Sequence, residues 1–125
     1  MLKNNTHIKL SIIVVHFNTE GLSRACLNSI YEHGSDLEIE IFLVDNGSTD
    51  NSVQNLKPEF PNVKFIRLEK GIGFGAANNV AVRQSVGEFI LFLNSDTEIK
   101  NDALKRVCDF MDGNFRCDLV GCRLI

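Results

Sequence analysis

Short apolar runs alternate along this chain with segments that carry apolar side chains at helical spacing. The apolar runs predict five strands, at residues 9–15, 38–44, 63–68, 88–93 and 118–124. The intervening segments predict four helices, at residues 20–31, about 50–56, from the glycine cluster 71–75 to about 85, and 102–111. This alternation predicts an α/β fold with a mostly parallel, Rossmann-like sheet and helices on both faces. The third strand alternates apolar and polar residues, so we expect it to be the more exposed one.

Length, charge and composition limit the classes of protein to which the chain can belong. With 125 residues, the chain is expected to form a single domain spanning 1–125, shortened at its C-terminal end because it stops within an apolar strand. A net charge of −3 argues against nucleic-acid binding. No stretch approaches 18 apolar residues, so no transmembrane helix is expected. The four cysteines form neither a Cys-x-x-Cys motif nor a zinc site, and are interpreted as small buried side chains in a reducing cytosol.

Two strands end at an aspartate followed by small polar residues. The second strand leads into Asp45, Asn46 and Gly47, and the fourth leads through Asn94 into Asp96. Ligands of open α/β sheets bind outside the carboxyl ends of the strands. The two acids therefore predict one cleft that holds a metal and an anionic or polyhydroxyl ligand.

The two acids are expected to have different tasks. Beside a diphosphate, a bare Asp96 would repel the ligand by about 4 kcal/mol at ~4 Å and an effective dielectric near 20. A Mg²⁺ or Mn²⁺ bound between the carboxylate and the diphosphate would turn this repulsion into attraction. Asp45 could accept a hydrogen bond from a pyrimidine base or a ribose hydroxyl, aimed inward by the turn at Asn46 and Gly47. Asp50 is better explained by the dipole of its own helix.

The first strand ends at the same edge with His16, Phe17 and Asn18. Backbone groups there, with Phe17 as a flat wall, could hold a base. His16 is interpreted as a polar wall or a solvated residue, since no partner completes a catalytic triad.

The glycine cluster leaves an alternative open. Residues 71–76 fit the pattern G-x-G-x-x-A, and Asp96 lies at a suitable distance for a ribose-binding acid, as in a dinucleotide-dependent oxidoreductase. Against this, the motif follows the third strand rather than the first. A phospho-receiver domain is excluded, because the acidic pair, aspartate and lysine that it requires are missing at the matching strand ends.

Taken together, four segments resemble the family 2 glycosyltransferases of the GT-A fold, and most of all their rhamnosyltransferase-like branch. The segments are IIVVHFN at 12–18, LVDNGSTD at 43–50, GFGAANN at 73–79 and LNSDT at 93–97. Each motif is weak alone, but the ordered set covers nearly the whole chain.

The resemblance implies a nucleotide-sugar-binding half-domain and gives roles to individual residues. It places His16, Phe17 and Asn18 near the base, and Asp45 with its neighbour Asn46 on the nucleotide. Gly73 and Asn79 fall in the segment that shapes the donor pocket. Asp96 matches the metal-binding acid of the Asp-x-Asp motif, with Mg²⁺ or Mn²⁺ as the cofactor.

Three positions depart from the family pattern. Asn94 replaces the first acid of the metal motif, Gly71 stands where Asn is usual, and Ala81 where Gly is usual. The first departure implies weaker metal binding, and the other two concern contacts with the donor.

The resemblance implies an inverting glycosyltransferase that moves a sugar from a UDP- or dTDP-sugar to a glycan or lipid-linked acceptor. The expected compartment is the cytoplasm or the inner face of the membrane, where such enzymes build polysaccharide. This chain would carry the donor-binding portion, with the catalytic base beyond Ile125. The alternative is a non-catalytic nucleotide-binding fragment.

Overall fold

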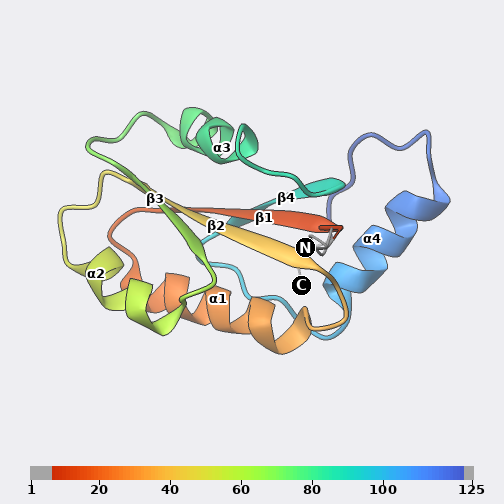
Figure 1. Cartoon of the computed structure of the whole chain (residues 1–125), viewed down its shortest axis with the longest axis horizontal. Coiled ribbons are helices and arrows are strands. Elements are labelled where there is room, and N and C mark those ends of the chain that lie inside the picture. Colours follow the sequence, from red (N-terminus) through yellow and green to blue (C-terminus); the bar gives the residue numbers. More distant parts are fainter. Residues whose placement is uncertain (1–6, 123–125) are drawn as a thin grey trace, which may run out of the picture.

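The computed structural model describes residues 7–122 and contains a four-stranded parallel sheet with helices on both faces (Figure 1). The strands lie in the order β3-β2-β1-β4. Their bounds are β1 Leu10–His16, β2 Ile39–Asn46, β3 Lys64–Leu68 and β4 Phe89–Asn94. The predicted fold class is therefore confirmed.

The strand register aligns the carboxyl ends at one edge of the sheet. His16 of β1 pairs with Asp45 of β2, and Val15 pairs with Asn94 of β4. On the other side, Asn46 of β2 pairs with Leu68 of β3. Since all strands run in parallel, the loops that follow them leave the sheet side by side.

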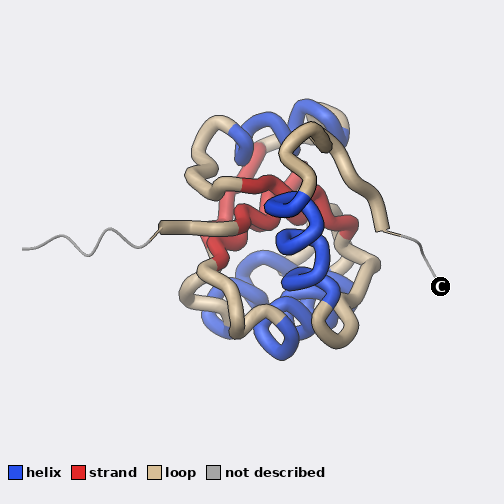
Figure 2. Tube along the Cα trace, turned by 90° about the vertical axis from the view of Figure 1, so that its right-hand side faces the viewer, coloured by secondary structure: helices blue, strands red, loops and turns tan. Residues whose placement is uncertain are grey.

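Helices cover the two faces unequally. The helices are α1 Glu20–His33, α2 Ser52–Leu56, α3 Phe74–Val82 and α4 Ala103–Gly113, and a 3₁₀ turn at Lys57–Glu59 follows α2. Figures 1 and 2 show α3 alone on one face, with α1 and α2 on the opposite face. Both faces of β1 and β2 are thus covered, which explains why these strands are continuous apolar runs.

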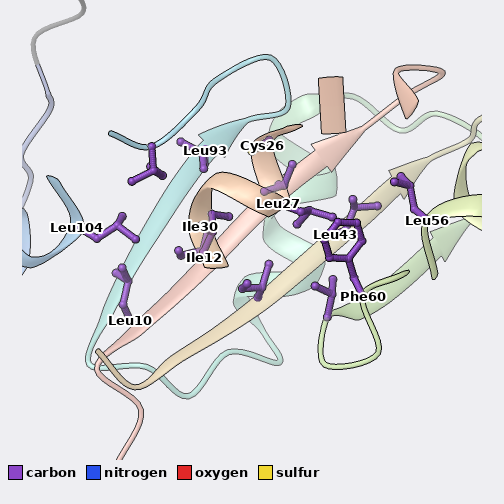
Figure 3. Close-up of a cluster of buried hydrophobic side chains, with 14 of the residues drawn as sticks. Leu10, Ile12, Cys26, Leu27, Ile30, Leu43, Leu56, Phe60, Leu93 and Leu104 are labelled. Carbon is purple, nitrogen blue, oxygen red and sulfur yellow. The ribbon is translucent and has the colours of Figure 1, made fainter. Parts of the chain in front are cut away.

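The larger core lies between the sheet and α1. Figure 3 shows Cys26, Leu27 and Ile30 of α1 packed over Ile12 and its neighbours on the strands. Leu56 and Leu104 bring α2 and α4 into the same cluster. The smaller core on the other face joins Ala77 and Ala81 of α3 to apolar residues of β1 and β2. The small alanine side chains let α3 lie close to the sheet.

The strand predicted at residues 118–124 is wrong over the residues that the structure describes. Residues 118–122 form no strand, and residues 123–124 lie outside the described residues. Leu119 is 87% exposed. An apolar run becomes a strand only with a partner to complete its backbone hydrogen bonds, and the described chain pairs no strand with this segment.

Smaller differences concern ends and cysteines. Helix α3 stops at Val82 rather than near 85, because the next turn closes with a backbone hydrogen bond from Ser85 to Val82. Cys26 and Cys108 are buried as expected, but Cys117 is partly exposed and Cys122 is exposed. Across residues 7–122, no helix combines the length and apolar character needed to cross a bilayer.

Candidate functional site

An open cleft of about 400 Å³ lies at the carboxyl edge of the sheet, on the side of α3. Phe17 and Asn46 line it from the loop after β1 and the end of β2, and Asp96 lines it from the loop after β4. The remaining lining residues are Val15, Thr19, Leu22, Phe74, Asn94 and Ser95. A second hollow of similar size lies at the end of α4, around Phe110 and Phe115, and contains none of the predicted site residues.

The turn that carries Asp96 is held by the carbonyl of Asn94. This oxygen accepts hydrogen bonds from the Thr97 amide at 3.0 Å and from the Thr97 hydroxyl. The Cys26 thiol also donates to it, at 3.8 Å. Three donors on one carbonyl fix the turn on both sides, which leaves Ser95 and Asp96 facing the cleft.

Asp45 lies at the same edge but does not line the cleft. Its side chain is 2% exposed, and Oδ1 accepts a hydrogen bond from the Ser48 amide at 3.0 Å. The expected direct contact with a base or ribose is therefore absent from the open cleft. The carboxylate instead stabilises its own turn, as aspartates often do two or three residues before a loop amide.

Asn18 joins the loops that follow β1 and β2. Its backbone is left-handed, with φ at 49°, a conformation that asparagine tolerates better than most residues. Its Oδ1 accepts from the amides of Thr49 and Asp50, and its own amide donates to Ser48 Oγ at 2.9 Å. Asn18 therefore holds the two loops together and does not line the cleft.

The interpretation of His16 as solvated or as a wall of the site is wrong for its side chain. The imidazole is fully buried, because His16 points to the same face of β1 as Ile12 and Val14, and α1 covers this face. Nδ1 lies 2.6 Å from Ser23 Oγ and Nε2 lies 2.7 Å from Ser52 Oγ. Both ring nitrogens are thus engaged by protein groups.

The glycine segment leads into Phe74, which lines the cleft. Gly73 has φ 92° and ψ 154°, a region open essentially to glycine alone, and it is the N-cap residue directly before α3. Gly47 also has a positive φ, 84°, and a Cβ there would lie 2.5 Å from the Gly71 nitrogen. The Asn46 side chain accepts from the Ile72 amide at 3.0 Å. The loops after β2 and β3 are therefore in direct contact.

Within this segment the structure separates two neighbouring asparagines. Asn79, the one singled out from the sequence, is exposed and does not line the cleft. Asn78 is buried, donates to the Phe74 carbonyl at 3.1 Å, and leaves Oδ1 as a buried acceptor without a partner among the described residues. The glycine motif also follows the edge strand β3, whereas a dinucleotide fingerprint follows the first strand of its unit.

Thiol chemistry is excluded at this edge. Burial, together with the negative charges of Asp96 and Glu98, raises the pKa of the Cys26 thiol to about 12. Because only the thiolate is a strong nucleophile, Cys26 stays an inert hydrogen-bond donor at neutral pH.

The donor set of the cleft suits a metal that arrives with its ligand. Among residues 7–122, no three His, Cys, Asp or Glu side chains gather as a metal site. Of the residues that the structure describes, Asp96 is the one acid that lines the cleft, and no lysine or arginine lines it. Mg²⁺ is commonly held by one or two carboxylates together with substrate phosphates and water. Asp96 therefore fits one corner of such a shared site.

Sequence reasoning missed three cleft residues and two serines. Thr19 and Leu22 belong to the start of α1, and Phe74 begins α3. Phe74 had a signal, as the one aromatic side chain inside a glycine-rich stretch. Ser23 and Ser52 had none, because their role depends on a histidine that is distant in sequence.

Comparison with known proteins gives a consistent picture. A family model described as "Glycosyl transferase family 2" matches residues 11–124. An uncharacterized glycosyltransferase of Haemophilus influenzae is 34% identical over 90% of this chain and 49% of its own length. The poly(ribitol-phosphate) beta-glucosyltransferase of Bacillus spizizenii is 38% identical over 86% of this chain and 18% of its own length.

A solved structure shows the same fold. Residues 1–349 of Staphylococcus aureus TarS, crystallised in complex with UDP, match 86% of this chain with a TM-score of 0.76 and 34% identity. The match covers 33% of that chain. The chain thus spans half or less of the length of these relatives. The matches support the family without distinguishing a rhamnosyltransferase-like branch.

Proposed function

The chain belongs to glycosyl transferase family 2, and from that premise we propose that its cleft binds the nucleotide of a nucleotide-sugar donor. The observation that carries the proposal is the convergence of Phe17, Asn46 and Asp96 on one cleft at the carboxyl edge. These residues come from the carboxyl ends of three different strands or the loops that follow them, and they combine an aromatic surface, an amide and a carboxylate.

Each cleft residue supplies one part of donor binding. Phe17 is 53% exposed and offers a face on which a base can stack, and the neighbouring Phe74 extends the apolar wall. Asn46 and Thr19 offer hydrogen-bonding groups for the base or ribose. Asp45 and Asn18, expected from the sequence to touch the nucleotide, are assigned to holding the loops that present these groups. The assignment to UDP follows the relative crystallised with UDP.

Asp96 is assigned to a divalent cation shared with the diphosphate. The described residues that line the cleft include an acid and no basic side chain, so a diphosphate alone would meet net repulsion from them. A bound Mg²⁺ or Mn²⁺ would supply charge stabilisation for the leaving diphosphate. Ser95 and Asn94 add neutral oxygen and nitrogen groups beside the carboxylate.

The whole reaction is proposed as sugar transfer from a UDP- or dTDP-sugar to a glycan or lipid-linked acceptor, with inversion at the anomeric carbon. The proposed setting is polysaccharide synthesis in the cytoplasm or at the inner membrane face. No residue of this chain is assigned as the general base. A nucleotide-binding module without transfer activity is the alternative, and an assay of UDP release from the donor with and without acceptor separates the two.

Titration calorimetry with UDP tests the proposal. The chain should bind UDP more tightly with Mn²⁺ than with EDTA, and Asp96→Asn should lose most of this metal-dependent gain, about tenfold or more in Kd. Asp36→Asn changes an exposed acid outside the cleft and serves as the matched control. Equal affinity with and without metal, or an Asp96→Asn chain that keeps the gain, would contradict the assigned role.

A further inference from the structure

The buried imidazole of His16 connects three segments of the chain. His16 ends β1, Ser23 lies in the second turn of α1, and Ser52 begins α2. Ser52 in turn bonds to Asp50 through both its hydroxyl and its backbone amide. On the other side, Ser23 Oγ lies 3.5 Å from the hydroxyl of Thr19, which lines the cleft. These five residues form one continuous row of polar contacts, called here the His16 relay.

The direction of each hydrogen bond in the relay follows from its acidic end. Hydrogen bonds from Ser52 lower the pKa of Asp50, so at neutral pH its carboxylate only accepts. The Ser52 hydroxyl therefore gives its proton to Asp50, and its oxygen can only accept from His16 Nε2. A neutral imidazole carries one N–H, so Nδ1 must accept from the Ser23 hydroxyl.

The remaining contact continues the same direction. Since Ser23 donates to His16, its oxygen is free to accept from the Thr19 hydroxyl. Every group then donates once toward Asp50, and both ring nitrogens of a fully buried side chain are satisfied.

We propose that His16 is a positioning residue, held as the neutral Nε2–H tautomer, that fixes the two loops presenting the nucleotide-binding groups. Phe17 and Thr19 lie on the loop directly after His16, and Asn46 precedes the loop that ends at Asp50. Asn18 joins the same two loops from the solvent side. The consequence for nucleotides rests on the proposed function, but the tautomer and the loop positions do not.

The surroundings of the imidazole favour the neutral form. The charged groups that act on it are Asp45 of β2, Asp50 beside α2 and Glu20 of α1, and each favours a protonated ring. Burial outweighs them and lowers the pKa of His16 below 6.5. Acid would place a second proton on Nδ1, where Ser23 could no longer donate. The direction of the relay between Thr19 and His16 would then have to reverse.

Nitrogen NMR of the histidine rings tests the tautomer without any nucleotide. Long-range ¹⁵N–¹H spectra of the 125-residue chain at pH 7 should show His16 with its proton on Nε2, and a His16→Gln chain identifies the signals. The ring should stay neutral to below pH 6.5, because burial lowers the pKa of His16. A proton on Nδ1, rapid exchange between tautomers, or titration near 6.5 would overturn the proposal.

Variants test the positioning role. His16→Leu and Ser52→Ala should shift the backbone amide signals of Asn18, Thr49 and Asp50 in a folded chain. They should also weaken UDP binding about tenfold, the effect of one lost hydrogen bond. His16→Gln keeps a donor for Ser52 and should recover part of that loss. Ser35→Ala, at an exposed position, is the control.

The outcomes separate this inference from the proposed function. Variants that leave the loop amides unchanged would overturn the positioning role, as would unchanged UDP affinity in a chain whose wild type binds UDP. If the wild-type chain binds no UDP, the proposed function fails, and the tautomer and amide shifts alone decide the role of His16.

Discussion

At the scale of single residues, backbone conformation at the loops decides what the cleft can present. Gly73 and Gly75 lie two positions apart in the same segment, yet their backbone conformations differ. Gly73 has a φ of 92°, whereas Gly75 lies inside α3. A Cβ meets no atom within 4 Å at either position. Any difference between substitutions at these glycines therefore reports backbone strain rather than crowding.

This pair gives a clean prediction. Gly73→Ala should lower the free energy of unfolding by about 1–3 kcal/mol, because alanine is strained at this φ and ψ. Gly75→Ala should be neutral or raise it by up to about 1 kcal/mol, because alanine is the better helix former. Urea denaturation of both variants measures the difference. Two equal effects would show that the left-handed conformation at Gly73 is not required.

At the scale of elements, a buried acid ties the amino-terminal half of the sheet together. Glu40 of β2 is 6% exposed, and its Oε1 accepts from the Ser11 hydroxyl of β1 at 2.6 Å. The same oxygen accepts from the Val86 amide, at 2.7 Å, in the connection that leads from α3 to β4. Its Oε2 accepts from Lys64 of β3, also at 2.7 Å. One carboxylate thus joins three strands and a loop.

The pH dependence of this cluster follows from its hydrogen bonds. Burial by itself would raise the pKa of Glu40, but the bonds from Lys64, Ser11 and Val86 lower it below 4.5. Its contribution to stability is therefore complete above the unfolded value of 4.5 and is lost as the pH falls through the folded value.

Glu40→Gln should lower the free energy of unfolding by about 1–3 kcal/mol at pH 7, since charge-assisted bonds become neutral ones. The gap to the wild type should narrow as the pH falls below 4.5. Glu38→Gln, at an exposed position, should stay within about 0.5 kcal/mol of the wild type. Urea titrations at pH 7 and in acid provide the comparison, and a gap that widens in acid would contradict this role for Glu40.

The elements were largely predictable, because each depends on local periodicity. The four strands of the sheet and the two-sided arrangement of helices follow from the order of apolar residues. The expectation that the third strand is the more exposed one is wrong, because the other edge strand, β4, exposes Ile90 and Phe92. The strand predicted at 118–124 is wrong over residues 118–122, because a strand also needs a neighbouring strand, which periodicity does not report. At the site, the strand ends pointed to Phe17, Asn46 and Asp96, and these three residues line one cleft. Side-chain direction was not predictable for His16 and Asp45, because it depends on which face α1 covers.

At the scale of the whole molecule, electrostatics make the cation central. The chain has a net charge of −3, and the described residues that line the cleft include an acid but no lysine or arginine. Long-range steering would therefore not favour an anionic ligand. If this cleft binds a nucleotide diphosphate, base stacking on Phe17 and a cation at Asp96 must supply the affinity. The dependence of nucleotide binding on a divalent cation is thus the central prediction of the proposed function.

The most direct measurement is a ¹⁵N–¹H correlation spectrum of the chain titrated with UDP and Mg²⁺. If the cleft binds the nucleotide through a metal, the amide signals should shift together for Phe17, Thr19, Asn46, Phe74 and residues 94–96. EDTA should reverse most of the change. Signals from Phe110 and Phe115, at the separate hollow near α4, should stay in place. Shifts confined to that hollow, or shifts at the cleft that persist in EDTA, would contradict metal-dependent binding of the nucleotide at the cleft.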